Sequence, residues 1–195
     1  MINREKALKF LNEQVGNENI IKHMLAVEAL MAEIYDALKT KERTDLGGNR
    51  EEWMMAGLLH DGDYKEGVPV EKMGIQITDW LREEGYEIPE NVAHTMAAHN
   101  WGNTGVEPKS LMDWAIFCGD TLTGLIIATT LVRPDKKLAS VEVKSVMKKF
   151  KQPAFAAGTR REEIALCEEK LGIPLRDFVE IGLQAMQGVA TDLGL

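Results

Sequence analysis

The chain has 195 residues, of which 45% are hydrophobic and 28% are charged, and its formal net charge is −8 at pH 7. This length suits one soluble domain with a sizeable apolar core. The negative charge argues against a protein that coats nucleic acid non-specifically. No segment contains the roughly 20 uninterrupted apolar residues of a membrane helix, and the charged N-terminal residues lack the apolar core of a secretory signal.

Apolar residues recur at helical spacing along nearly the whole chain. Asn3 and Asn17 are suitable N-caps for the first two helices, the second of which extends to about Lys39. The other expected helices cover about residues 50–61, 71–84, 89–100, 109–131, 141–151, 160–171 and 174–193, and a glycine-rich loop covers 101–108. Because no strand-like alternation flanked by hairpin turns is present, the predicted fold class is all-α.

The two cysteines, Cys118 and Cys167, form neither a metal-binding CxxC pair nor a disulfide framework. Free cysteine usually packs as a small hydrophobic residue, so we expect two buried thiols in a reducing compartment. The predicted location is the cytoplasm.

Positive charge is concentrated between Arg133 and Arg161, where nine basic residues accompany only two acidic ones. The rest of the chain is acidic. Such a segment is either a solvated face or a local surface for an anionic partner.

All four histidines lie in the first hundred residues, and two of them fall at sites that favour metal binding. His23 lies within the apolar stripe of the second helix, where a lone histidine is more often a structural core residue than a ligand. His60 and Asp61 directly follow the apolar run 53–59, so an imidazole and a carboxylate leave a buried helix end together. Burying both without a cation is costly.

Asp120 poses the same problem, because it lies deep in the apolar helix expected at about 109–131. A divalent metal shared with His23, His60 and Asp61 would supply the missing positive charge. Two imidazoles and two carboxylates form a plausible nitrogen and oxygen site that leaves coordination positions for water.

The order of His23, His60-Asp61 and Asp120 resembles the HD superfamily of metal-dependent phosphohydrolases, in which these four residues bind the metal. The resemblance implies a helical HD domain that holds a metal through them. It also implies hydrolysis of a phosphate ester by a metal-activated water. We expect residues 1–132 to form this metal-binding core and residues 133–195 to form a helical extension packed on the same domain.

A closer likeness extends over nearly the whole chain. Three segments, Gly57–Tyr64, Asp120–Ile126 and Phe155–Gly158, are similar to a small group of bacterial and archaeal proteins known only as predicted HD hydrolases.

Two departures from the family pattern bear on the number of metal ions. Gly62-Asp63-Tyr64 stands where many members have Ile-Gly-Lys, so the customary lysine is absent. Two-metal members carry another histidine at the start of the next helix, but residues 70–77 contain none, and Met73 is the nearest candidate. We therefore expect one divalent ion per chain, which could be Mn, Fe, Co, Ni, Zn or Mg.

His99 matches a histidine that two-metal relatives carry on the following helix. It shares an inward face with Val92 and Met96, whereas His94 lies about 140° away around the helix and fits a partly exposed structural role. His99 or Asp63 would relay a proton to the leaving oxygen. Asp63 fits a loop carboxylate without a catalytic role equally well.

The basic segment offers counter-charges for a phosphate above the metal. Lys144, Lys148 and Lys151 share one helix face, and Arg133 closes the helix that carries Asp120. Gly158-Thr159-Arg160 precedes another helix, whose N-terminus also favours an anion. The predicted substrate-binding residues are Arg133, Lys148 and Arg160.

Other enzyme classes fit less well, because the sequence has no His-Glu-x-x-His, Glu-x-x-His, serine elbow, Walker A loop or dinucleotide fingerprint. The leading hypothesis is a phosphohydrolase for a nucleotide or another small phosphate ester. The alternative is a non-enzymatic, metal-supported binding or signalling module for an anionic ligand, and the third is a metal-free helical scaffold. No membrane or nucleic-acid polymer is expected as a partner, and a homo-oligomer is compatible with the sequence.

Overall fold

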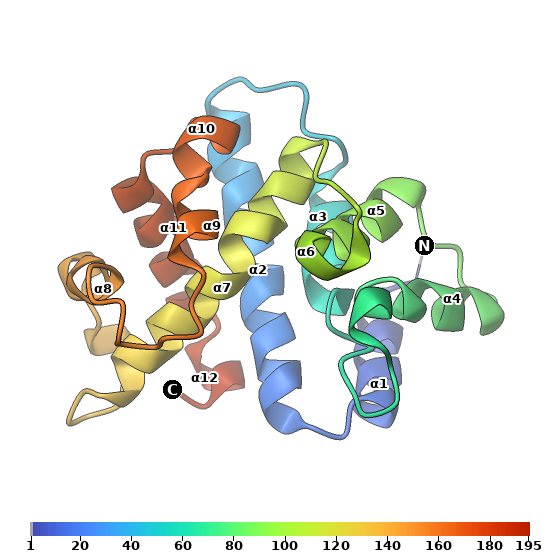
Figure 1. Cartoon of the computed structure of the whole chain (residues 1–195), viewed down its shortest axis with the longest axis horizontal. Helices are drawn as coiled ribbons and strands as arrows, with labels where there is room; N and C mark the ends of the chain where they lie inside the picture. The colour runs from blue at the N-terminus through green and yellow to red at the C-terminus, as the bar shows by residue number, and fades with distance from the viewer. Residues whose placement is uncertain (1) are drawn as a thin grey trace.

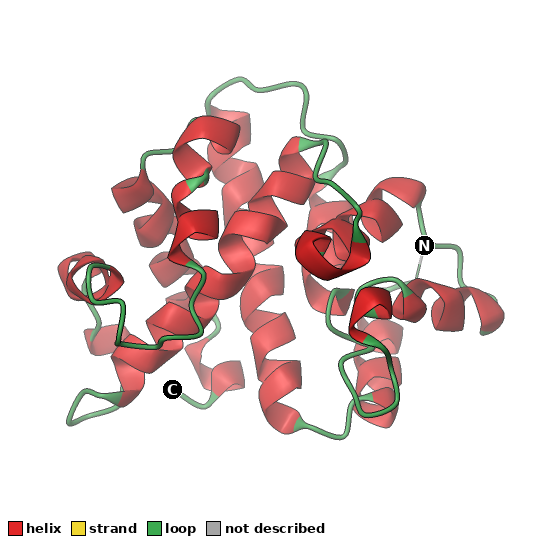
Figure 2. Ribbon diagram, viewed as in Figure 1, coloured by secondary structure: helices red, strands yellow, loops and turns green. Residues whose placement is uncertain are grey.

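The structure is a computed structural model that describes residues 2–195 as helices joined by loops and turns (Figure 1, Figure 2). No strand occurs in that range, so the predicted all-α class is confirmed. Helices α2 (Glu18–Thr40) and α7 (Leu111–Leu131) lie side by side at the centre of the molecule. The other α-helices are α1 (Arg4–Gln14), α3 (Arg50–Leu59), α4 (Gln76–Glu83), α5 (Glu90–His99), α6 (Trp101–Thr104), α8 (Val143–Phe150), α9 (Arg161–Ala165), α10 (Cys167–Leu171), α11 (Leu175–Gly188) and α12 (Ala190–Leu193), and there are two short 3-10 helices, η1 (Val70–Lys72) and η2 (Leu138–Ser140).

Side-chain caps begin the helices that carry the site. Asn3 accepts a hydrogen bond from the Lys6 amide at the start of α1, and Asn17 caps α2 in the same way, so both predicted N-caps are confirmed. Helix α3 starts with a capping box at Asn49, and α7 starts with another at Ser110. Each cap satisfies an amide that the helix itself leaves unpaired.

Helix α3 approaches α2 closely because Gly57 has no side chain. A Cβ atom at this position would lie 2.9 Å from the Glu28 Cα and 2.9 Å from the Val27 carbonyl oxygen of α2. This close contact holds the C-terminal end of α3 against α2. Consequently, His60 and Asp61, which follow α3, lie next to His23 on α2.

Residues 133–195 pack on the two central helices. Helix α11 lies against α2, and α9 and α10 lie against α7. The buried residues of this segment, such as Val146, Phe178 and Leu183, join the same apolar cluster as those of α1 to α7. One core therefore includes side chains from both sides of residue 132.

Helix α7 is long and apolar enough to cross a membrane by length and composition alone. However, 61% of its most apolar window is buried inside the fold. That burial is typical of the core helix of a soluble protein.

Four of the expected segments differ from the observed ones. The predicted helix at 71–84 consists of η1 and α4, separated at Gly74. The predicted helices at 160–171 and 174–193 are each divided in two, at Leu166 and Val189. The predicted loop 101–108 contains the short helix α6, whose Trp101 packs against aromatic rings of α7.

The break before α4 depends on Asp63. Gly74 has a φ of 89°, a left-handed conformation that glycine adopts readily. Its amide donates to both carboxylate oxygens of Asp63 at 2.9 Å, and the Ile77 amide donates to Asp63 Oδ2 at 2.9 Å. Because α4 has no side-chain cap of its own, the distant carboxylate of Asp63 takes that role.

Gly74→Ala is expected to lower the free energy of unfolding strongly. The new methyl group would overlap the Met96 carbonyl oxygen and lie 2.9 Å from Cε1 of His99. Gly85 is the matched control, since it has a similar φ of 82° but open space around its Cα. Gly85→Ala should cost about 1 kcal/mol, and Gly74→Ala a further ~1–3 kcal/mol, by urea unfolding. Equal losses in the two variants would show that the contact with His99 is not tight.

Candidate metal centre

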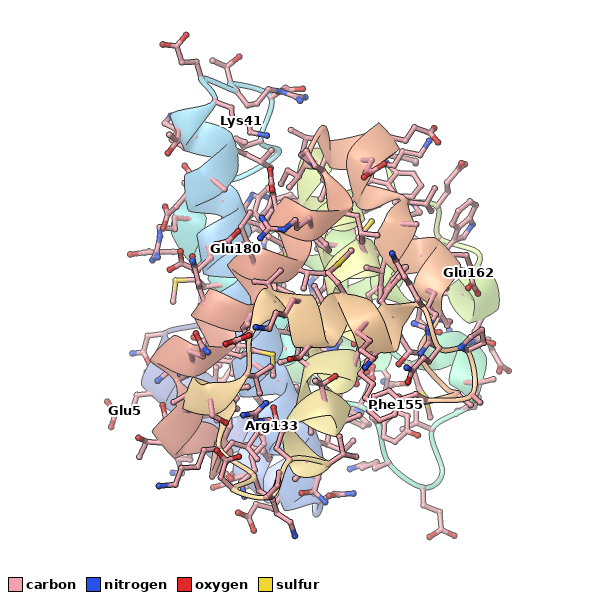
Figure 3. The ribbon with its side chains drawn as sticks, turned by 90° about the vertical axis from the view of Figure 1, so that its left-hand side faces the viewer. Glu5, Lys41, Arg133, Phe155, Glu162 and Glu180 are labelled. Carbon is pink, nitrogen blue, oxygen red and sulfur yellow. The ribbon has the colours of Figure 1, made fainter. Side chains whose placement is uncertain are left out.

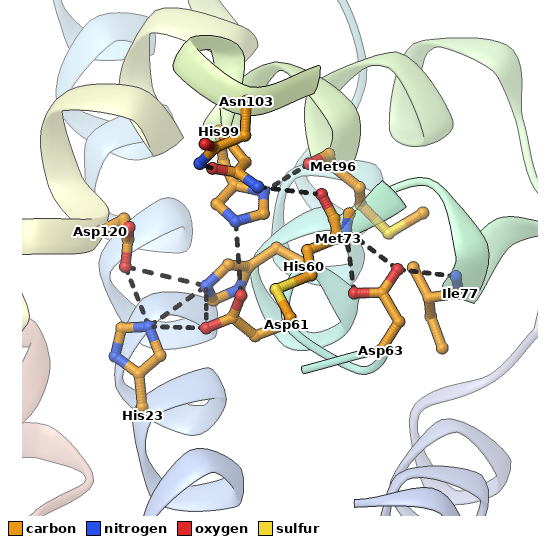
Figure 4. A network of polar contacts seen from close by, with 12 residues as sticks. His23, His60, Asp61, Asp63, Met73, Ile77, Met96, His99, Asn103 and Asp120 are labelled. Atoms are coloured by element: carbon orange, nitrogen blue, oxygen red, sulfur yellow. Dashed lines mark hydrogen bonds and ion pairs between the residues drawn. The ribbon is translucent and has the colours of Figure 1, made fainter. Parts of the chain in front are cut away.

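Histidines and carboxylates from four parts of the chain converge between α2, α3, α5 and α7 (Figure 4). His23 comes from α2, His60 and Asp61 follow α3, His99 ends α5, and Asp120 lies on α7. One ligand atom from each of His23, His60 and Asp61 lies within 4.8 Å of the others, so these three residues could hold a metal ion.

The separations between the ligand atoms fit a small divalent cation. His23 Nε2 lies 3.2 Å from His60 Nε2 and 2.9 Å from Asp120 Oδ1. Asp61 Oδ2 lies 3.6 Å from His23 Nε2 and 3.5 Å from His60 Nε2. Metal–ligand bonds of about 2.0–2.2 Å place neighbouring ligand atoms about 3.0 Å apart in an octahedron and about 3.4 Å apart in a tetrahedron.

The other ring nitrogen of each histidine is occupied by a protein acceptor. Nδ1 of His60 lies 2.8 Å from the Gly57 carbonyl oxygen, and Nδ1 of His99 contacts the Met96 carbonyl oxygen. A carbonyl only accepts, so both Nδ1 atoms must donate. The Thr123 hydroxyl gives its one hydrogen to the Asp120 carbonyl at 2.8 Å, so at 3.1 Å it accepts from Nδ1 of His23.

It follows that each neutral ring presents a lone pair on Nε2 to the centre. The lone pairs of His23 and His60 face one another and the carboxylates of Asp61 and Asp120. Acceptors that face acceptors repel unless a proton or a cation lies between them. Nδ1 donation to a protein acceptor is also the arrangement by which metal-binding histidines are oriented.

Each carboxylate divides its two oxygens between the centre and a cation beside it. Oδ2 of Asp61 faces His23 and His60, and its Oδ1 lies 3.3 Å from Nε2 of His99. Oδ1 of Asp120 faces the histidines, and its Oδ2 lies 3.4 Å from Nη2 of Arg160. His99 and Arg160 therefore lie beside the centre, each next to the carboxylate oxygen that does not face His23 and His60.

The pKa values reflect this concentration of charge. Burial favours the neutral carboxyl, yet the surrounding imidazoles lower the pKa of Asp61 to about 2 and hold that of Asp120 well below its usual value. Burial also opposes protonation of His99, but the hydrogen bond and charge of Asp61 raise its pKa to about 9. In the same way Asp120 raises the pKa of His23 against the effect of burial. Without a metal, protons on His23 and His99 offset the charge of the carboxylates.

Two hollows open beside the centre, and both are lined by Asp120 and Arg160. The first has a volume of about 340 Å³, and Ala156–Arg160 form one wall of it beside His23 and Thr121. The second, of about 250 Å³, is lined by Asp61 and His99 together with Tyr64, Val70, Met73, Asn100 and Asn103. A ligand can therefore reach the centre from solvent.

The structure brings together His23, His60, Asp61, Asp120 and His99, as the sequence led us to expect. Figure 4 shows their side chains pointing toward one another. His94 lies apart, with Nδ1 3.1 Å from Asp113 Oδ2, in agreement with a structural role.

Asp63 is fully buried and directs its carboxylate to the amides of Gly74 and Ile77. This arrangement favours the structural role over the predicted proton relay. Met73, the nearest counterpart of the absent histidine, lines the hollow beside His99.

Of the predicted substrate-binding residues, only Arg160 lies at the centre. Arg133 lies just beyond the C-terminal end of α7, and the helix from Asp120 to Leu131 alone spans about 16 Å. Arg133 Nε donates to Ser140 Oγ at 2.8 Å. Figure 3 views this side of the molecule, with Arg133 at the end of α7 and Phe155 in the loop before α9. Lys148 is exposed on α8 and lines neither hollow.

Sequence reasoning missed three residues that support the centre: Thr121, Thr123 and Arg161. Thr123 lies one helical turn after Asp120 on a largely apolar helix, so both side chains fall on the same face of that helix. This spacing could have predicted the contact of Thr123 with His23. Thr121 accepts a hydrogen bond from the Arg160 amide at 3.0 Å. This contact joins segments 39 residues apart, so no local pattern indicates it. Arg161 bonds only to backbone carbonyls of residues 150–159, which leave no pattern of side chains in the sequence.

No protein-family profile matches this chain, and no curated protein or solved structure is significantly similar to it. The metal centre is therefore inferred from the residues of this chain alone.

The metal-free protein should lose stability as the pH rises from neutral to alkaline. Because folding raises the pKa of His99 from 6.5 to about 9, the stabilisation is complete below pH 6.5 and disappears as the pH passes about 9. Urea unfolding of metal-free wild type and His99→Gln between pH 6 and 10 tests this. The wild type should be the more stable at pH 6.5, and the difference should shrink toward pH 9.5. A difference independent of pH would contradict the ion pair with Asp61.

Proposed function

We propose that this protein is a metal-dependent phosphohydrolase of the HD superfamily that holds one divalent ion through His23, His60, Asp61 and Asp120. The observation that carries the proposal is the inward convergence of two Nε2 lone pairs and two carboxylate oxygens at ligand spacing. The order of these residues along the chain is the order that the superfamily uses.

The residues around the centre suit hydrolysis of a phosphate ester. A bound divalent ion supplies Lewis acidity and lowers the pKa of a coordinated water to roughly 7. His99 holds a proton at Nε2 beside Asp61 Oδ1 and borders the second hollow, so it is the proton donor for the leaving oxygen. Arg160, next to Asp120 Oδ2, neutralises the phosphoryl oxygens.

Removing a ligand should remove the metal. His60→Ala and Asp61→Ala should each retain well under half of the wild-type metal content, because the remaining carboxylates and imidazoles lose a partner in a mostly buried site. Elemental analysis of purified protein measures this. His94→Ala is the control, since His94 contacts Asp113 instead of the centre, and it should keep about one ion per chain. Wild-type metal content in both ligand variants would refute the site.

His99→Ala should reduce catalysis while the metal stays bound. We expect kcat to fall by about 10²-fold, the low end for loss of a general acid or base, with metal content unchanged. His99 contacts Oδ1 of Asp61, whereas Oδ2 of Asp61 faces His23 and His60. Loss of the ion in His99→Ala would instead make His99 a metal ligand.

Turnover decides whether the protein is an enzyme. Protein loaded with Mn, Fe, Co, Ni, Zn or Mg should release inorganic phosphate from at least one ester in a panel of nucleotides and sugar phosphates. His60→Ala should abolish that release. Metal binding without any phosphate release would favour a binding or signalling module for an anionic ligand.

A further inference from the structure

The loop between α8 and α9 is built around the guanidinium of Arg161. Nε donates to the Phe150 carbonyl at 2.8 Å, and Nη2 donates to the carbonyls of Gln152 and Phe155 at 3.1 and 2.5 Å. Nη1 donates to the carbonyls of Thr159 and Ala156 at 3.2 and 3.5 Å. These five bonds use all five N–H groups of an arginine, so Arg161 has none left for a ligand.

Residues 156–160 of this loop line the first hollow, together with His23, Asp120, Thr121 and Gly124. Ala156 has a φ of 45°, a left-handed conformation that costs energy for any residue other than glycine. The bonds from Arg161 to its carbonyl and to that of Thr159 hold the backbone there. Ala156, Ala157 and Gly158 leave the hollow open, because their side chains are small and a Cβ at Gly158 would meet no atom within 4 Å.

Arg160 is held in place but keeps donors free. Its amide is tied to Thr121, the residue after Asp120, and its Nε donates to Glu163 Oε2 at 2.5 Å. Nη2 lies 3.4 Å from Asp120 Oδ2. Its Nη1 has no hydrogen-bond partner among residues 2–195. The guanidinium therefore keeps unused N–H groups, and Arg160 lines both hollows at the metal centre.

Arg160 is also the only lysine or arginine that lines either hollow. Two other positive charges of the segment have partners elsewhere: the Lys149 ammonium lies over the Phe155 ring at 4.3 Å, and the Lys144 ammonium pairs with Glu142 at 2.6 Å. Asp61 and Asp120 add negative charge beside the hollows. A single guanidinium and one divalent ion suit one phosphoryl group, whereas a polyphosphate chain would meet no further counter-charge.

We propose that Arg160 and the loop 156–160 form a subsite for the single phosphoryl group of a phosphomonoester, and that Arg161 is its positioning residue. This inference deepens the proposed function and rests on it for the metal. Arg160 contacts the phosphoryl oxygens with its free N–H groups. Arg161 shapes the wall from which Arg160 extends.

Binding of inorganic phosphate to zinc-loaded protein, measured by isothermal titration calorimetry, tests the subsite without requiring turnover. Arg160→Gln should weaken phosphate binding by roughly 10- to 100-fold, which corresponds to the loss of one charge-assisted hydrogen bond. Arg160→Lys should recover part of the loss, because a point charge still attracts phosphate. Arg161→Lys should recover little of the loss in Arg161→Gln, since an ammonium cannot make five bonds to carbonyls. Arg176→Gln, an exposed arginine of α11, is the charge control and should bind as wild type.

Two further measurements sharpen the test. Pyrophosphate should bind no more tightly than phosphate. Gly158→Leu should block phosphate by filling the hollow, whereas Gly188→Leu, which also adds a side chain in open space, should not. If Arg161→Gln does not fold, Gly158→Leu decides whether the wall belongs to the site.

Wild-type phosphate affinity in Arg160→Gln, or tighter binding of pyrophosphate, would overturn the proposal, as would failure of phosphate to bind the zinc-loaded wild type. Metal content is measured in every variant and should stay at the wild-type value. If Arg160→Gln loses phosphate binding but the wild type hydrolyses no ester, the hydrolase proposal fails and the phosphoryl subsite stands.

Discussion

The nitrogens His23 Nε2 and His60 Nε2 lie 3.2 Å apart, and both rings donate through Nδ1 to acceptors of the protein. Two lone pairs at that distance, with the carboxylates of Asp61 and Asp120 beside them, repel one another strongly because the groups are mostly buried. Protons relieve this repulsion in the metal-free protein, as the raised pKa values of His23 and His99 indicate. A divalent cation would relieve it more completely, because its two positive charges would lie beside both lone pairs and both carboxylates.

The fold is arranged so that this repulsion cannot be avoided by movement of the side chains. Gly57 lets α3 touch the backbone of α2, which fixes the distance between His60 and His23. Gly74 packs its Cα against His99 and is tied to Asp63, so the ring of His99 stays beside Asp61. Thr123 orients His23 from α7. The same constraints that make the metal-free centre unfavourable make it pre-organised for an ion.

Much of this could be predicted from the sequence, because it depends on local patterns. Apolar periodicity and asparagine caps correctly predicted that the long elements are α-helices. The apolar neighbours of Asp120 indicated a carboxylate that needs a positively charged partner. The break at Gly74 was not predictable in this way, since it depends on a hydrogen bond that the Gly74 amide donates to the Asp63 carboxylate, eleven residues earlier. Lys148 and Arg133 were assigned to the substrate from their charge and their places on the predicted helices. However, Arg133 lies beyond the far end of α7 from Asp120. Arg161 was missed because its partners are carbonyl oxygens, which leave no sequence signal.

The central claim is that Nε2 of His23 and of His60 faces a metal while Nδ1 of each ring keeps its hydrogen. Long-range ¹H–¹⁵N correlation spectra of the zinc-loaded protein report the tautomer of every histidine directly. The account predicts that both rings carry hydrogen on Nδ1, with Nε2 shifted by zinc, and that His60→Ala removes the zinc-dependent shift of His23. A hydrogen on Nε2 of either ring in the zinc-loaded protein would contradict it, because that nitrogen could then not be a ligand.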